Sequence, residues 1–416
     1  MRRADFQALR MRLLREWKIT DNRIIKFTVL LALAVMACIS LIAGAKNAFN
    51  YSQDFQWDAA KALMLNIDPY ELSQRSNEDV TQCPELADFY SLFTQKGLKQ
   101  KMEANQFPSL LMLLFPFTLV SPMSARVAWL VFNLLCTAGS VILLRKTFLT
   151  EMTGFEFASL SLLMIAGTPY RNQLGVGQHT LFSFFFFMLA VYFDQKEVKG
   201  QSVYITLSLF VSYFKYTLTA PLALYMIYKK RYREVFVSVL MHVIATVFFA
   251  IRLNRSVFYL LSEPLKVAMN LSAEGGLDIG ALVGGGSLSL IIGAVVGVFL
   301  LLLSIKMPKD CDYLLMPVLV LWSLIITYHR TYDFFVLSLV SMFLCRTFYE
   351  QIGEKSYRLW LAAYLLLIIL VYFVLRLFGE NDFSRMAVGT VYYLFTVALS
   401  VLAVKKCRAE RIKVNE

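Results

Sequence analysis

Long apolar runs that recur along the whole chain are the feature that most constrains its fold. Most are about 14 to 20 residues long, close to the roughly 20 that a helix needs to cross the hydrocarbon core of a bilayer. Lipid offers no water to satisfy backbone N–H and C=O groups, so each crossing segment must satisfy them within its own secondary structure. Runs of this length predict helices rather than a barrel. The predicted fold class is therefore an all-α polytopic membrane protein.

Composition and charge agree with a membrane protein. Of the 416 residues, 58% are hydrophobic and only 17% are charged, which is too apolar for a soluble chain of this length. The net charge of +12 could indicate a nucleic-acid partner. The basic residues, however, lie in short clusters between the apolar runs, as the positive-inside rule requires. The charge therefore indicates orientation in a membrane, and we expect no nucleic acid as a partner.

The basic clusters predict twelve spans with both termini in the cytoplasm. Most of the 41 lysine and arginine residues then lie in cytoplasmic segments. The run at residues 107–120 is short and contains two prolines, so we interpret it as a re-entrant or interfacial helix at the outer face. Counting it as a full span would invert every later loop and place the basic connectors outside, against the rule. The predicted spans are residues 27–45, 125–144, 155–169, 180–193, 202–215, 217–228, 235–251, 287–305, 313–328, 333–345, 358–375 and 387–404.

The predicted organisation follows from these spans. A cytoplasmic basic N-terminus precedes an uncleaved anchor; the main transmembrane module carries two external loops; further helices and a cytoplasmic basic tail complete the chain. Every polar cluster that interrupts apolar sequence then falls on the outer face, where we expect the chemistry. The corresponding ranges are residues 1–26 for the N-terminus, 27–345 for the module, 46–124 and 252–286 for its external loops, 346–404 for the C-terminal helices and 405–416 for the tail.

The first external loop carries two carboxylates, Asp54 and Asp58, at a spacing of four residues. On a helix this spacing puts both side chains on one face, and Asp68-Pro69 would end that helix because proline restricts the residue before it. A carboxylate at the mouth of an apolar groove can take a proton from a hydroxyl. The alternative is that both acids only solvate a surface helix. Asp54 and Asp58 are the candidate catalytic residues.

Four cationic side chains are predicted near the outer ends of spans: Arg126, Arg171, Lys215 and Arg330. Such groups could hold a phosphate, since a charge-assisted contact strengthens where water is scarce. Each could instead extend its charged end toward the membrane surface. Lys215 lies between two apolar runs, a costly place for a charge without a function.

Two histidines add polar groups to the same predicted face. His329 and Asp333 are four residues apart, so the acid could orient the imidazole toward a phosphate, or the pair could be a structural bond at a helix start. His179 follows Gly177-Gln178, a glycine-containing turn without the pattern of a nucleotide loop. We expect Gln178 and His179 to bind the substrate. No set of His, Cys and carboxylate residues has metal-ligand spacing, so the sequence predicts neither a metal nor a cofactor.

The order of these groups resembles glycosyltransferase family 87, a family of bacterial polytopic enzymes with the GT-C fold that includes polyprenol-phosphate-mannose-dependent mannosyltransferases. The resemblance covers residues 25–345. It rests on Asp54-Phe55-x-x-x-Asp58-Ala59-Ala60, Asp68-Pro69-Tyr70, Phe107-Pro108, Gly177-Gln178, Lys215-Tyr216-Thr217 and His329-x-x-Tyr332-Asp333.

The resemblance implies a function and a location. The donor would be a polyprenyl-phosphate sugar, the acceptor a lipid or glycan, and the site would face outward from a bacterial inner membrane. Asp54 would be the catalytic base, and the His329 motif with Tyr332 would lie beside the donor phosphate. A different class of protein, a transporter or flippase of lipid-linked sugars, would bind the same headgroup without breaking a bond.

Overall fold

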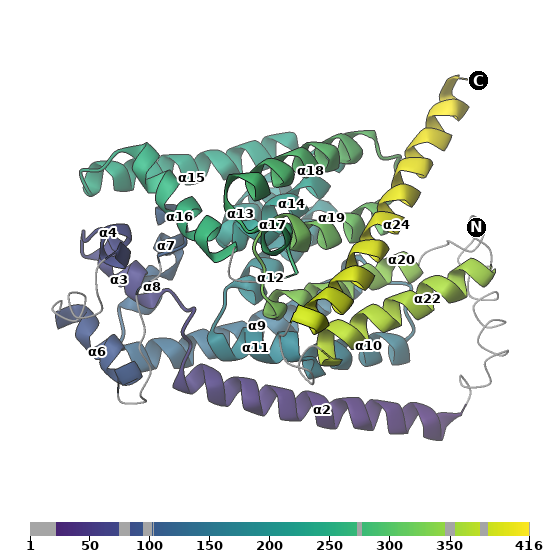
Figure 1. Ribbon diagram of the computed structural model, residues 1–416, viewed down its shortest axis with the longest axis horizontal. Coiled ribbons are helices and arrows are strands. Elements are labelled where there is room, and N and C mark those ends of the chain that lie inside the picture. Colours follow the sequence, from purple (N-terminus) through teal and green to yellow (C-terminus); the bar gives the residue numbers. More distant parts are fainter. Residues whose placement is uncertain are drawn as a thin grey trace.

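The computed structural model describes residues 22–74, 84–94, 102, 104–272, 277–345, 354–374 and 382–415, and every element in these ranges is helical (Figure 1). Several predictions concern residues outside these ranges. They are most of the basic N-terminus, parts of the predicted external loop at residues 46–124, and the connections before and within the C-terminal helices.

Six helices are long and apolar enough to cross a membrane, and a bent pair raises the number to seven, by length and composition. This makes the chain a polytopic helical membrane protein. The six lie at predicted spans: α2 (Arg23–Asn50), α9 (Pro122–Thr147), α15 (Tyr232–Arg252), α18 (Gly286–Lys306), α22 (Glu354–Ile369) with the π-helical turn η4 (Leu370–Val374), and α24 (Asp382–Asn415). α24 includes most of the predicted basic tail.

The remaining predicted spans are shorter helices. They begin and end close to the predicted bounds, but each is shorter than the roughly 20 residues of a straight crossing. Length therefore leaves the count of twelve unconfirmed. These helices are α10 (Gly154–Ala166), α12 (Thr180–Asp194), α13 (Gln201–Ser212), α14 (Tyr216–Tyr228), α19 (Asp312–Ile326), and η3 (Thr331–Ser341) with α20 (Met342–Cys345).

The run with two prolines forms three short pieces instead of one helix. They are α7 (Pro108–Leu111), η1 (Met112–Leu114) and α8 (Phe115–Thr118). At about 1.5 Å per residue the helical pieces together, Pro108–Thr118, are roughly 16 Å long, about half of the hydrocarbon core. It is therefore too short for a full helical span, in agreement with the re-entrant or interfacial interpretation.

The single helix predicted to carry Asp54 and Asp58 is not formed as expected. α3 begins at Trp57 and ends at Met64, so Asp54 lies before the helix and Asp58 within it. Gln56 separates them in the left-handed conformation, with φ +52°, so the chain turns sharply between the two acids. They do not share a helix face. After α3 the chain continues through α4 (Pro69–Gln74) and α6 (Pro84–Thr94).

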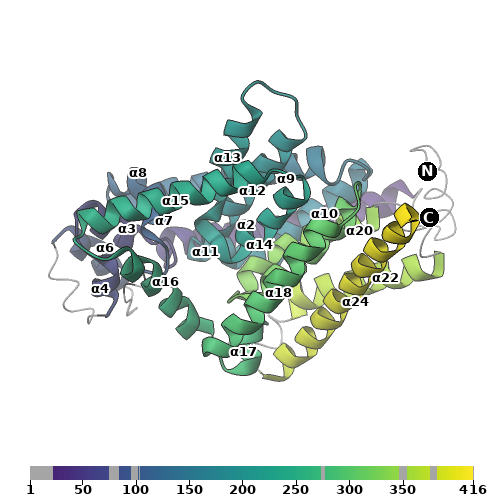
Figure 2. The ribbon, with the colours of Figure 1, turned by 90° about the horizontal axis from the view of Figure 1, so that it is seen from above.

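The predicted external loop at residues 252–286 is largely helical. It contains α16 (Val257–Ser272) and α17 (Ile279–Val283). Just before α16, Arg255 forms an ion pair of 2.9 Å with Asp68 and a second one with Glu71. These contacts attach the start of α16 to α4, so the two segments predicted to be external support each other (Figure 2).

A sharp bend in the middle of the molecule positions the residues described below. α11 (Thr168–Val176) and α12 meet at 108°, and Gly177 occupies the left-handed conformation between them, with φ +69°. A Cβ atom at Gly177 would lie 3.1 Å from the Cβ atom of Ser52. The indole of Trp129 donates a hydrogen bond of 2.8 Å to the Gly177 carbonyl. The bend is thus fixed from two sides.

Gly177→Ala is expected to destabilise the protein by about 1 to 2 kcal/mol, because alanine disfavours the left-handed conformation and its methyl group would press on Ser52. The apparent melting temperature of the detergent-solubilised protein measures this. Gly154→Ala is the matched control, because a Cβ atom there meets nothing within 4 Å. Equal melting temperatures for the two variants would contradict the role given to the bend.

Candidate functional site

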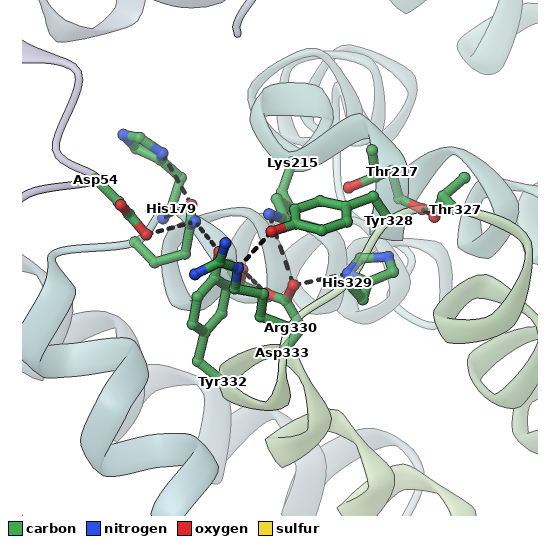
Figure 3. A network of polar contacts seen from close by, with 12 residues as sticks. Asp54, His179, Lys215, Thr217, Thr327, Tyr328, His329, Arg330, Tyr332 and Asp333 are labelled. Carbon is green, nitrogen blue, oxygen red and sulfur yellow. Dashed lines mark hydrogen bonds and ion pairs between the residues drawn. The ribbon is translucent and has the colours of Figure 1, made fainter. Parts of the chain in front are cut away.

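Three helices begin at one polar cluster. α12 follows His179, α14 follows Lys215 and η3 follows Arg330, and none of these preceding residues caps its helix with a side-chain hydrogen bond. The N-terminal end of a helix carries a partial positive charge and free N–H groups. Figure 3 shows residues of these three junctions side by side. The arrangement favours a negatively charged group.

Asp333 is the centre of the cluster. Its carboxylate is fully buried and accepts hydrogen bonds from the Thr180 hydroxyl and from His329 Nδ1, the latter at 2.7 Å. Lys215 Nζ lies 3.6 Å from the same carboxylate. A buried charge is tolerated when it is paired and hydrogen-bonded, so Asp333 holds three chain segments together (Figure 3).

Lys215 also contacts the aromatic ring of Tyr332. Its Nζ lies 5.7 Å from the centre of the Tyr332 ring, a cation–π distance. Its backbone N–H donates to Ser183 Oγ at 2.8 Å, which fixes the short break η2 (Tyr213–Lys215) against α12. The structure therefore explains the charge between two apolar runs, since Lys215 pairs with Asp333 instead of extending outward.

His329 presents one ring nitrogen without a partner. Nδ1 is bonded to Asp333, while Nε2 is buried and has no hydrogen-bond partner in the described part of the chain. The neighbouring carboxylate is Asp278, to which the backbone N–H of His329 donates a hydrogen bond. A buried ring nitrogen without a hydrogen bond is costly, so the described residues leave one polar atom of the cluster unsatisfied.

Sequence reasoning missed Asp278. Its side chain is 1% exposed and caps α17 by accepting the N–H of Ala281 at 3.3 Å. The N-cap pattern before Ile279-Gly280-Ala281 was readable in the sequence. Its place beside His329 was not, because about fifty residues, including a span, separate the two.

Asp54 joins the cluster through the side chain of Gln178. Gln178 Nε2 donates to Asp54 Oδ2 at 3.2 Å and to the Tyr332 hydroxyl at 2.9 Å. The backbone N–H of Asp54 donates to the Val176 carbonyl at 2.9 Å. The carboxylate is half-buried. The structure thus brings Asp54 to the predicted group around Lys215.

Arg330 is the most exposed cation of the site. Its guanidinium donates a hydrogen bond to the Tyr328 hydroxyl, and its charge interacts with Asp54 and Tyr332. Both Arg330 and Tyr328 lie on the loop between α19 and η3 (Figure 3). A cation therefore lies next to the only half-buried acid of the cluster among the residues described.

His179 supports the site from within. It is 1% exposed, and its ring packs against Phe214 and Trp129, with ring centres 4.3 and 5.4 Å away. Its two ring nitrogens face Gln178 Oε1 at 3.2 Å and the Phe55 carbonyl at 3.4 Å. These contacts indicate a structural role for His179, where the sequence suggested binding of substrate.

Asp58 and Arg126 form a separate cluster. Asp58 accepts a hydrogen bond of 2.7 Å from the Tyr90 hydroxyl, and the Arg126 guanidinium lies 5.3 Å from the centre of the Phe89 ring. Burial raises the pKa of the Asp58 carboxyl, although the Tyr90 bond and Arg126 oppose the shift. These two predicted residues connect α3, α6 and α9 and are not part of the Asp333 cluster.

Arg171 also lies apart. Its guanidinium donates to Asn172 Oδ1 at 3.2 Å, and its carbonyl oxygen lies where α11 packs closely against Gly44 of α2. These contacts place Arg171 at the interface between α11 and α2. Among the described residues, no three His, Cys, Asp or Glu side chains gather as the ligands of one metal ion would.

Lys215→Met is expected to destabilise the protein by about 3 to 5 kcal/mol, because it leaves the buried Asp333 charge without its cation. The double variant Lys215→Met/Asp333→Asn should recover much of this loss, since no charge then remains unpaired. Apparent melting temperatures of both variants in detergent measure the difference. A double variant that is no more stable than the single one would contradict this account of the pair.

Comparison of the chain with known proteins found no relative that could assign a role to these residues. No family model matches the chain, and neither a curated protein nor a solved structure matches it.

Proposed function

We propose that the protein is a membrane glycosyltransferase. It would move a hexose, most simply mannose, from a polyprenyl-phosphate sugar to a hydroxyl of a lipid or glycan acceptor. One observation carries the proposal: a half-buried carboxylate, Asp54, lies beside cations and helix N-termini to which it is joined through Gln178 and Tyr332. Transfer of a sugar from its phosphate needs both kinds of group: a base for the acceptor hydroxyl and positive charge for the leaving phosphate.

The phosphate of the donor would lie at the start of η3 and α14. Arg330 supplies an exposed cation, and Lys215 supplies a second one shared with Asp333. His329 Nε2, which no described group binds, would donate to the phosphate when the ring carries both of its protons. Donors fixed in advance at the position of a developing charge stabilise the transition state without reorganisation. The charge that grows on the leaving phosphate would therefore be compensated as the bond breaks.

Asp54 would act as the general base. It takes the proton of the acceptor hydroxyl while that oxygen forms a bond to the anomeric carbon. The bond from the anomeric carbon to the phosphate oxygen breaks in the same step, and polyprenyl phosphate leaves with the bonding electrons. This single displacement inverts the configuration of the sugar. The lipid phosphate already activates the sugar, so the reaction needs no nucleotide.

The proposal includes a location and a fold. Twelve crossings in a GT-C-like arrangement would place the Asp54 site at the outer face of a bacterial inner membrane. The distribution of basic connectors supports this orientation. The breaks in the helices beside Lys215 and Gly177 support a polar site at membrane depth. Irregular backbone is tolerated there where protein buries it or a polar cavity adjoins it.

A transporter or flippase of lipid-linked sugars is the second candidate. Buried charges at broken helices are typical of transporters, and Lys215 and the 108° bend at Gly177 both have this character. Such a protein would move the labelled lipid across a proteoliposome membrane and release no polyprenyl phosphate. The two functions are separated by whether the bond to the phosphate breaks.

Asp54→Asn is expected to lower the rate of transfer by at least about 100-fold, the range for loss of a general base. The measurement is release of polyprenyl phosphate from radiolabelled polyprenyl-phosphate mannose, given an acceptor extract, by purified protein in proteoliposomes. Asp88→Asn is the matched control, an exposed carboxylate on the same external segment. Asp54→Asn that keeps the wild-type rate and melting temperature would refute the proposed base.

Arg330→Gln is expected to raise the Kd for the polyprenyl-phosphate sugar about tenfold or more, because a hydrogen bond to a charged group contributes roughly 1.5 to 3 kcal/mol. Arg171→Gln, which removes the same charge outside the cluster, should change the Kd less than twofold. Binding of the labelled donor to the detergent-solubilised protein measures both. Equal effects of the two substitutions would argue against a phosphate site at η3.

A further inference from the structure

The side-chain amide of Gln178 is bound by other groups of the protein. Its Nε2 donates to Asp54 and to Tyr332. Its Oε1 accepts the backbone N–H of His179 at 2.9 Å and faces His179 Nδ1 at 3.2 Å. A glutamine side chain offers two hydrogens and two acceptor positions, so both hydrogens are used and the oxygen is bound by the backbone N–H of His179. Gln178 therefore has no hydrogen left to donate to a substrate, although the sequence suggested that it binds one.

The orientation of this amide is determined by its partners. The backbone N–H of His179 can only donate, so the oxygen of the amide must face it. The nitrogen then faces Asp54, which as a carboxylate can only accept. The reverse orientation would put two oxygens together at Asp54 and two N–H groups together at His179. The backbone of Gln178 is fixed as well, since its carbonyl accepts from Gln173 Nε2 at 2.8 Å.

We infer that Gln178 is the positioning residue of the proposed base: it holds the Asp54 carboxylate in its reactive orientation by donating a hydrogen bond to Oδ2. The inference rests on the proposed function. Gln178 binds the Oδ2 atom of Asp54, and this bond restricts rotation of the carboxylate that would receive the proton of the acceptor hydroxyl. Through its second hydrogen, Gln178 also ties the base to Tyr332, and so to the start of η3, where the phosphate would bind.

Several other charged and titratable groups lie around Asp54 and could also affect its pKa. Arg330, on the loop before η3, and Tyr332 of η3 both interact with Asp54. His179 lies behind Gln178 at the start of α12, and Lys215 lies over the ring of Tyr332. All four of these side chains are unchanged when residue 178 alone is substituted. A substitution that changes only the donating group at position 178 therefore isolates its role.

Gln178→Met removes the donor while keeping a side chain of similar length. It is expected to lower kcat by about 10- to 100-fold at every pH, the scale of a misplaced catalytic group. The Kd for the donor should change less than twofold, because the amide does not contact it. The apparent melting temperature shows whether the variant is folded. An unchanged kcat in folded Gln178→Met would overturn the inference.

Gln178→Glu provides the sharper test. A protonated glutamic acid can donate to Asp54 as the amide does, whereas an ionised one repels it. Two neighbouring carboxylates share one proton, and the loss of that proton moves above the usual glutamate value of roughly 4.3. We therefore expect the ratio of variant to wild-type kcat to rise by about tenfold or more as the pH is lowered from 8 to 5. A ratio independent of pH would overturn the inference.

Gln53→Glu is the control for charge alone. It adds the same negative charge next to Asp54 in the chain, but on an exposed side chain, where solvent screens it. Its ratio to wild type should be nearly constant with pH. Failure of the proposed function is recognised separately: the wild type would then release no polyprenyl phosphate, or Asp54→Asn would be as active as wild type. Either of those results also overturns the role of Gln178.

Discussion

The buried carboxylate of Asp333 is the contact on which the centre of this protein depends. Thr180, Lys215 and His329 belong to three separate segments, and each donates to it or pairs with it. Desolvating an isolated charge costs several kcal/mol even after relaxation. No one of these groups would be stable alone at this depth. Together they are satisfied, and the starts of α12, α14 and η3 are held at one place.

A second fixed point lies at the bend between α11 and α12. The left-handed Gly177 lets the chain pass close to Ser52, and Trp129 binds its carbonyl. The neighbouring Val176 carbonyl accepts the backbone N–H of Asp54. The Asp54 segment is thus attached to the same bend whose following residues contact Tyr332 and Asp333. The backbone therefore couples the acid to the cations before any ligand is present.

The positions of most helices could be predicted from the sequence, because burial in lipid imposes long apolar runs. The grouping of Lys215, His329 and Asp333 also followed, since charges that interrupt such runs must find partners. The helix expected to carry both Asp54 and Asp58 was wrong, because spacing alone does not reveal the left-handed turn at Gln56. The sequence also placed Arg126 and Arg171 in the wrong surroundings and gave no indication of Asp278. Which side chains surround these residues depends on which helices pack together, and the hydrophobic periodicity of each helix does not encode that.

The attachment of Asp54 has a consequence for how such a protein can diversify. Its backbone and carboxylate are bound by Val176 and Gln178. The helices that follow it in the chain are held by other contacts: Asp58 joins α3 to Tyr90 of α6, and Asp68, just before α4, pairs with Arg255. Substitutions within α3, α4 and α6 can therefore change the surface of the protein without removing the bonds that hold Asp54.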